Sequence, residues 1–216
     1  MIKAIIFDLD GVLIDSENFV INIYRKFIEE YDMDLKVEDF YIMIGGNRRM
    51  NHLKLIYDKS KMGWSEELFR ERLDLVKKRE RANFSFDQIV FKETKPVLAK
   101  LHELGYKIVC ASSSHIDYIN RALKECEITE YFDIIVSGLD FKESKPNPEI
   151  YNYCVDKLGF DKSECVVVED STYGIEAANR ANLFVYGRKD ERFGVDQSHA
   201  DKMINDLNDL LIELKK

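Results

Sequence analysis

Two aspartates follow a short apolar run near the start of the chain. Asp8 and Asp10 stand two residues apart, directly after Ala4–Phe7. Carboxylates this close repel each other, so the pKa of at least one should rise unless a cation lies between them. Mg²⁺ suits such a place because it binds carboxylate, carbonyl and water oxygens. Taken alone, the pair also fits an ordinary loop or a helix cap.

A second pair of acids repeats this arrangement. Glu169 and Asp170 follow the apolar residues 166–168. Two buried strands that both end in carboxylates are costly without a shared counter-ion. We therefore expect Asp8, Asp10 and Asp170 to form a site for a hard cation.

Two further stretches could hold an anion. Ser112 lies in the run Ala-Ser-Ser-Ser after residues 107–110, where a hydroxyl and backbone N–H groups at a strand-to-helix turn can bind an anion. Ser114 could instead simply cap a helix over residues 115–126. Lys145 precedes a proline that favours an extended backbone, so its ammonium group can be aimed at one point. A lysine considered alone is usually a solvated surface residue. Together, however, a site for a cation beside a site for an anion is suited to phosphoryl transfer.

The elements that must position these residues are visible as apolar patterns. Continuous apolar runs at residues 4–7, 108–111, 134–136, 166–168 and 184–186 indicate strands buried on both faces of a parallel sheet. A helix is expected over residues 95–104, where Leu104 shares an apolar face and Gly105 follows. Another is expected over residues 147–158, with Asn147 as cap and Pro148 in its first turn. The alternation predicts an α/β fold with a doubly wound, mostly parallel sheet.

One region interrupts this alternation. Residues 16–90 contain no strand-like run, whereas residues 19–31 and 66–81 have amphipathic helical patterns, and Met50, Leu53, Ile56 and Tyr57 share one helical face. We predict a core of residues 1–15 and 91–216 and a helical cap of residues 16–90. Ligands bind beyond the carboxyl ends of strands in such sheets, so the cap would cover the site.

The composition narrows the class of protein. The 216 residues carry a net charge of -8, which does not favour nucleic acid as a partner. No apolar stretch of about 18 residues indicates a membrane span or signal peptide, so we expect a cytoplasmic protein. No heptad or apolar patch indicates an oligomer, and a monomer is expected. The widely spaced cysteines are interpreted as reduced packing residues: Cys110, Cys126, Cys154 and Cys165.

Four motifs occur in a fixed order along essentially the whole chain. They are DLDGV at 8–12, ASS at 111–113, KP at 145–146 and VEDS at 168–171. In these motifs the chain resembles the haloacid dehalogenase-like (HAD) superfamily, in the branch that transfers phosphoryl groups and carries a helical cap after the first strand. The resemblance implies a Rossmann-like core.

The resemblance also implies roles for the motif residues. Asp8 would be the nucleophile that forms an aspartyl phosphate. Asp10 would be the general acid and base. The transferred phosphoryl group would be bound by Ser112, Ser113 and Lys145. Dehalogenase activity is not implied, because that chemistry has no use for Asp10.

A metal site follows from the same resemblance. Mg²⁺ would be held by the carboxylates of Asp8 and Asp170 and by the backbone carbonyl of Asp10. Glu169 would support this metal site.

Within the superfamily the chain is most similar to β-phosphoglucomutase-like sugar phosphatases. The stretch GVLIDSE looks like their hinge, and IGGNRR at 44–49 resembles their substrate-contacting cap loop. Gly46 and Arg49 are therefore candidate substrate contacts. A mutase is expected to carry a histidine shortly after the hinge aspartate, whereas Glu17, Asn18, Phe19 and Val20 follow here.

The expected function is therefore hydrolysis. We expect a Mg²⁺-dependent phosphatase acting on small phosphorylated metabolites, above all sugar phosphates, with a hexose phosphate mutase as the alternative. A phosphonate-cleaving relative would need a cap lysine, for which Lys54 is the nearest candidate. A signalling receiver would have roughly half this length and no cap. A binding protein with an inactive core would not be expected to keep every charged motif. We interpret residues 188–194 as solvated surface rather than a substrate-facing loop.

Overall fold

The computed structural model describes residues 1–44 and 50–215. The strands are β1 (Ala4–Phe7), β2 (Lys107–Ser112), β3 (Ile134–Ser137), β4 (Cys165–Glu169), β5 (Phe184–Arg188) and β6 (Lys202–Ile204). The α-helices are α1 (Ser16–Glu30), α2 (Met50–Ser60), α3 (Glu66–Ala82), α4 (Thr94–Glu103), α5 (Ile116–Glu125), α6 (Glu149–Leu158), α7 (Thr172–Arg180) and α8 (Leu207–Glu213). Short 3-10 helices are η1 (Val37–Met43), η2 (Phe86–Gln88), η3 (Thr129–Tyr131), η4 (Gly138–Asp140) and η5 (Lys162–Glu164).

The six strands form one parallel sheet in the order β3-β2-β1-β4-β5-β6. This confirms the predicted doubly wound α/β fold. Phe7 at the end of β1 pairs with Cys110 of β2 and Val168 of β4, so the polar residues that follow these strands meet at one edge. Strand β6 was not predicted; it has three residues, two of them exposed. A continuous buried apolar run could not identify such a strand.

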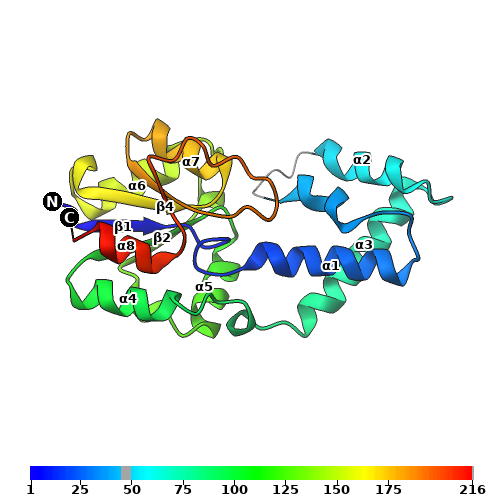
Figure 1. Cartoon of the computed structure of the whole chain (residues 1–216), viewed down its shortest axis with the longest axis horizontal. Coiled ribbons are helices and arrows are strands. Elements are labelled where there is room, and N and C mark those ends of the chain that lie inside the picture. Colours follow the sequence, from blue (N-terminus) through cyan, green and yellow to red (C-terminus); the bar gives the residue numbers. More distant parts are fainter. Residues whose placement is uncertain (45–49, 216) are drawn as a thin grey trace.

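Alternate residues of the central strand face opposite sides of the sheet. Ile5 and Phe7 belong to an apolar cluster with residues of α4, α5 and α8. Ala4 and Ile6 belong to a second cluster with residues of α6 and α7. The two groups of helices flank the sheet in Figure 1. Burial on both sides explains why β1 is apolar at every position.

A separate helical part lies at the end of the molecule opposite the two termini (Figure 1). It contains α1, η1, α2 and α3, which pack around an apolar cluster that includes Phe27, Phe40 and Phe69. Two chain segments join it to the sheet, and they meet where Ile14 forms an isolated bridge with Val90. The division into a core and a cap at these residues stays a prediction.

Three details of the expected helices are corrected. Leu104 is 50% exposed and is the C-cap of α4, so it does not share the buried face of Val97, Leu98 and Leu101. Helix α6 begins at Glu149 with Pro148, not Asn147, at its N-cap position, although the Asn147 side chain still accepts the Glu149 N–H at 2.9 Å. Helix α5 is capped by His115 rather than Ser114, because the His115 side chain accepts the Asp117 N–H.

Two general expectations can be compared with the structure. The four cysteines are free and buried, as expected for packing residues. In the described part of the chain, none of the helices combines the length and the apolar character that crossing a membrane requires.

Candidate active site

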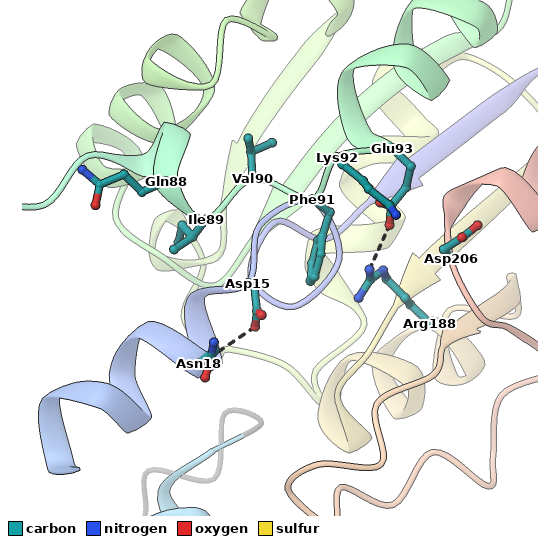
Figure 2. Close-up of a pocket in the computed structure, with 10 residues that line it drawn as sticks. All are labelled: Asp15, Asn18, Gln88, Ile89, Val90, Phe91, Lys92, Glu93, Arg188 and Asp206. Atoms are coloured by element: carbon teal, nitrogen blue, oxygen red, sulfur yellow. Dashed lines mark hydrogen bonds and ion pairs between the residues drawn. The ribbon is translucent and has the colours of Figure 1, made fainter.

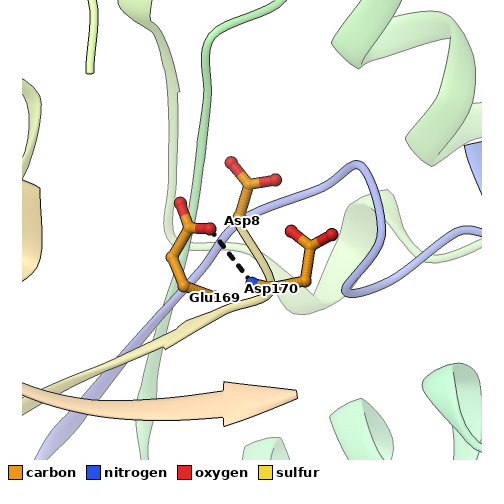
Figure 3. Close-up of side chains that lie close together, drawn as sticks. All are labelled: Asp8, Glu169 and Asp170. Atoms are coloured by element: carbon orange, nitrogen blue, oxygen red, sulfur yellow. Dashed lines mark hydrogen bonds between the residues drawn. The ribbon is translucent and has the colours of Figure 1, made fainter. Parts of the chain in front are cut away.

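Three buried carboxylates meet at the carboxyl edge of the sheet. Asp8 directly follows β1, Glu169 ends β4 and Asp170 follows it, and the register of the two strands makes them neighbours. One oxygen from each of the three side chains lies within 4.8 Å of the others. Figure 3 shows the three side chains close together. The structure thus brings together acids that lie about 160 positions apart in the chain.

Lys145 lies between two of these carboxylates. Its Nζ is 2.6 Å from Asp8 Oδ1 and 2.7 Å from Glu169 Oε1, and it also donates to the carbonyl of Ala111 at 2.9 Å. The Lys145 side chain is only 4% exposed, so it is not a solvated surface lysine. Burial alone would lower its pKa, but the charges of Asp8 and Glu169 outweigh burial and raise that pKa.

Glu169 has its oxygens occupied by donors. Oε1 accepts hydrogen bonds from Lys145 and from the hydroxyl of Tyr151 at 2.7 Å. Oε2 accepts from the Asp170 N–H and from both the N–H and the hydroxyl of Ser171. Burial opposes ionisation, but Lys145 and these hydrogen bonds lower the pKa of Glu169. Glu169 is therefore suited to holding Lys145 and the β4–α7 turn in place.

The pKa values of Asp8 and Asp170 shift in the direction opposite to that of Glu169. Burial raises the pKa of both carboxyl groups well above the ordinary value. For Asp8 the attraction of Lys145 does not offset burial, and for Asp170 the charge of Glu17 adds to it. A divalent cation beside these oxygens would remove the cost of ionising them, and hard carboxylate oxygens are the ligands that Mg²⁺ prefers.

Two glycines leave room for the acids. A Cβ on Gly11 would lie 2.0 Å from Asp170 Oδ2, and its φ of +78° favours glycine in any case. A Cβ on Gly174 would lie 1.8 Å from Glu169 Oε1. Each carboxylate therefore occupies the space that a larger residue in place of Gly11 or Gly174 would need for its side chain.

Asp10 lies outside the cluster of three acids and has its own partners. The hydroxyl of Ser114 donates to Oδ2 and the phenol hydroxyl of Tyr118 donates to Oδ1, both at 3.0 Å. Burial, followed by the charge of Asp10, raises the pKa of Tyr118, so the phenol stays protonated as a donor. From the sequence, Ser114 was considered only as a possible helix cap, and Tyr118 was not identified.

A cavity of about 620 Å³ opens over these residues. Its core wall includes the predicted site residues Asp8, Asp10, Ser112, Ser113, Lys145 and Asp170. Ser112 is buried and accepts the Ser114 N–H at 3.1 Å, whereas Ser113 is exposed. The structure thus brings the predicted acidic, hydroxyl and ammonium groups around one space.

The opposite wall of the cavity comes from the helical part and its linker. It includes Phe19 and Val20 of α1, Met43 of η1, and Arg81 of α3. Gly46 and Arg49, the candidate substrate contacts, lie outside the described residues. Phe19 and Val20, which follow Asp15 by four and five positions, therefore line the cavity in the part of the chain where a mutase would be expected to carry a histidine.

Residues 188–194 were interpreted as solvated surface, and this is wrong for Arg188 and Asp190, which are buried. Arg192 binds Asp15 through two ion-pair contacts of 2.8 and 3.0 Å. Phe193 packs edge-to-face on Tyr41 of η1, with ring centroids 5.2 Å apart. Gln197 donates to the backbone carbonyl of Asp170 at 2.6 Å. In Figure 1 this segment, coloured orange, extends from the sheet towards the helical part.

Arg188, the last residue of β5, holds the start of that segment against Phe91 and Glu93. It is buried, donates to Glu93 at 3.0 Å and lies over the ring of Phe91. All three residues line a second cavity of about 490 Å³, and Figure 2 shows how their side chains lie. The same figure shows Asp15 accepting the backbone N–H of Asn18 at the start of α1. No local pattern marks the pairs of Arg188 with Glu93 and of Arg192 with Asp15, because they join residues 95 and 177 positions apart.

Comparison with known proteins agrees with this architecture. The family model described as haloacid dehalogenase-like hydrolase matches residues 5–187. A phosphorylated carbohydrates phosphatase of Thermotoga maritima is 30% identical over 86% of this chain and 84% of its own length. A phosphoglycolate phosphatase of Aquifex aeolicus is 29% identical over 83% of this chain and 81% of its own length. A β-phosphoglucomutase structure from Clostridium difficile is 26% identical, covers 100% of this chain and 96% of that chain, and superposes with a TM-score of 0.71.

Proposed function

The chain belongs to the haloacid dehalogenase-like hydrolase family, and on that premise we propose that it is a Mg²⁺-dependent phosphatase of small phosphorylated metabolites. Sugar phosphates are the substrates we favour, and an aspartyl phosphate on Asp8 is the intermediate. A relative named for phosphorylated carbohydrates supports this substrate class. We also propose that residues 16–90 act as the cap over a core formed by the rest of the chain.

One observation supports the proposal above all others. The carboxylate of Asp8 lines the cavity and is held by Lys145 at 2.6 Å, beside Asp170, whose buried carboxyl group has a raised pKa. A nucleophile, a fixed cation and a further acid at one cavity edge are the groups that phosphoryl transfer requires.

The residues present fit a magnesium ion. We assign the metal to the Asp8 carboxylate, the Asp170 carboxylate and the Asp10 backbone carbonyl. Glu169 supports this site without being a ligand, because its oxygens already accept five hydrogen bonds. When bound, Mg²⁺ would neutralise charge on the phosphoryl oxygens during transfer.

The first step forms a bond between an Asp8 carboxylate oxygen and phosphorus. The bond from phosphorus to the ester oxygen breaks, and Asp10 gives its proton to the leaving oxygen. Lys145, Ser112 and Ser113 bind the phosphoryl oxygens while this charge moves. Asp10 then accepts a proton from water as the water oxygen attacks phosphorus, which restores the Asp8 carboxylate and releases inorganic phosphate.

A panel of phosphorylated compounds tests this proposal. Sugar phosphates, nucleotides and phosphoglycolate would be incubated with Mg²⁺ or with a chelator, and released phosphate measured. We expect the fastest release from sugar phosphates and none with chelator. Turnover that is insensitive to the chelator would contradict the metal assignment.

A mutase is the second candidate, since one structural relative is named a β-phosphoglucomutase. The apolar residues Phe19 and Val20 after the hinge support hydrolysis instead. β-Glucose 1-phosphate with a hexose bisphosphate distinguishes the two reactions. Glucose 6-phosphate appearing faster than free phosphate would overturn our preference for hydrolysis.

A further inference from the structure

We propose that Ser114 and Tyr118 are positioning residues for the general acid, because together they hold both oxygens of the Asp10 carboxylate. This inference rests on the proposed function, in which Asp10 protonates the leaving oxygen. It concerns two residues that lie outside the four motifs found in the sequence.

The two hydroxyls reach Asp10 from one turn of chain. Ser114 precedes α5 and Tyr118 lies in its first turn, so residues four positions apart point to the same place. Ser114 Oγ is 3.0 Å from Asp10 Oδ2, and Tyr118 Oη is 3.0 Å from Asp10 Oδ1. Contacts on both oxygens fix the plane of the carboxyl group, which a single contact would leave free to rotate.

Each of the two holding residues is itself restrained. The ring of Tyr118 packs edge-to-face on Phe86, with centroids 4.9 Å apart and planes at 90°. The backbone of Phe86 is held in turn, because its N–H donates to Glu125 of α5 at 2.9 Å. Tyr118 is therefore fixed between its own helix and the linker that leads out of the helical part.

Ser114 is fixed from the side of the phosphate-binding residues. Its N–H donates to Ser112 Oγ at 3.1 Å, and its carbonyl accepts the hydroxyl of Ser137 at 2.8 Å. The general acid is thus tied to the same strand end as Ser112. Asp8 has a separate restraint in Lys145, so the nucleophile and the acid are positioned by different groups.

Acid positioning and simple structural support predict different kinetics. A good leaving group departs without a proton, whereas a poor one needs the acid in the transition state. A misplaced acid should therefore harm poor leaving groups selectively. The ratio kcat/KM reports only the steps up to departure of the leaving group, so it is unaffected by later hydrolysis of the aspartyl phosphate.

The test measures kcat/KM for a series of phenyl phosphates whose ring substituents range from dinitro to none. All the compounds are phenyl phosphates of similar size. The logarithm of kcat/KM is plotted against the pKa of the released phenol. The variants are Tyr118→Phe and Ser114→Ala, with Ser114→Thr as the version that keeps a hydroxyl. Tyr106→Phe removes a phenol that precedes β2, and Asp10→Asn removes the acid itself.

We expect both Tyr118→Phe and Ser114→Ala to steepen the plot. The loss should be on the order of 10-fold to 100-fold with phenyl phosphate and about 2-fold or less with dinitrophenyl phosphate. Ser114→Thr and Tyr106→Phe should keep the wild-type slope.

The possible failures are distinguishable. If Asp10→Asn steepens the plot while Tyr118→Phe and Ser114→Ala only lower it uniformly, the two hydroxyls are merely structural and the inference is overturned. If Asp10→Asn itself leaves the slope unchanged, the role of Asp10 in the proposed function is wrong, and the inference is overturned with it.

Discussion

Arg192 and Asp15 form a two-point ion pair, with Nη1 2.8 Å from Oδ2 and Nη2 3.0 Å from Oδ1. Arg192 belongs to the segment after β5, whereas Asp15 caps α1, the first helix of the helical part. Asp190 also binds Arg192 and keeps its guanidinium in place. The pair therefore ties the sheet to the point where the chain enters the proposed cap.

Replacing Arg192 by alanine should affect both catalysis and stability. The exposed pair with Asp15 contributes less than about 1 kcal/mol to the free energy of unfolding, but losing the contacts to the buried Asp190 carboxylate should cost about 1–3 kcal/mol more. Loosening a hinge changes kcat and KM together, and we expect kcat/KM to fall several-fold. Arg70→Ala is the matched control, because it breaks an exposed pair with Glu66 within α3. Identical kinetics for the two variants would show that the Arg192 contact does not position the cap.

Replacing Gly174 by alanine should destabilise the protein although alanine favours helices. The added Cβ would lie 1.8 Å from Glu169 Oε1, and that carboxylate is fully buried. Overpacking costs about 1–3 kcal/mol, which exceeds the gain of up to about 1 kcal/mol from helix propensity. The midpoint of urea unfolding measures the balance. In Gly63→Ala, the control, no described atom lies within 4 Å of the new Cβ. An unchanged midpoint for Gly174→Ala would contradict the close packing of Glu169.

The metal site predicts a dependence of stability on pH. The pKa of Asp170 is raised in the folded protein, so between about pH 4 and that raised pKa the folded state binds more protons than the unfolded state. Without metal, this carboxyl group therefore lowers the free energy of unfolding as pH rises, by about 1.4 kcal/mol for each unit of pKa shift. Bound Mg²⁺ should reverse the loss.

Asp170→Asn tests this linkage. The metal-free variant should melt above metal-free wild type at pH 7, and the difference should vanish below pH 4. Mg²⁺ should raise the Tm of wild type but not of the variant. Asp156→Asn, at an exposed position of α6, should behave as wild type throughout. If metal-free Asp170→Asn melted at a lower temperature than metal-free wild type at pH 7, burial would not be the main influence on the pKa of Asp170.

The sequence predicted those parts of the molecule that depend on local pattern and on the geometry of parallel strands. Continuous apolar runs identified β1 to β5, and the common edge of parallel strands placed Asp8 beside Asp170. The contacts that helix side chains make with the carboxylates of the site were not predictable in the same way. Tyr151 and Tyr153 stand two residues apart in α6, yet Tyr151 is fully buried against Glu169 and Tyr153 is 39% exposed. Helical periodicity can separate their faces, but it does not reveal which hydroxyl meets a carboxylate.

The segment after β5 shows the same limit on a larger scale. Its charged residues have the composition of solvated surface, and Lys189 and Glu191 are indeed exposed. Arg192 has a local acidic partner in Asp190, but Arg188 pairs with Glu93 and Arg192 with Asp15 only because the fold brings these acids beside the end of β5. Pairing across such separations depends on tertiary structure, which no window of sequence contains.

Phosphate release by Asp8→Asn tests the central claim most directly. The substitution keeps the shape of the side chain but removes the nucleophilic carboxylate that Lys145 holds at 2.6 Å. With Mg²⁺ and the best substrate of the panel, and with a cooperative thermal transition showing that the variant is folded, we predict no release above background. Release within a few-fold of the wild-type rate would contradict an aspartyl phosphate on Asp8.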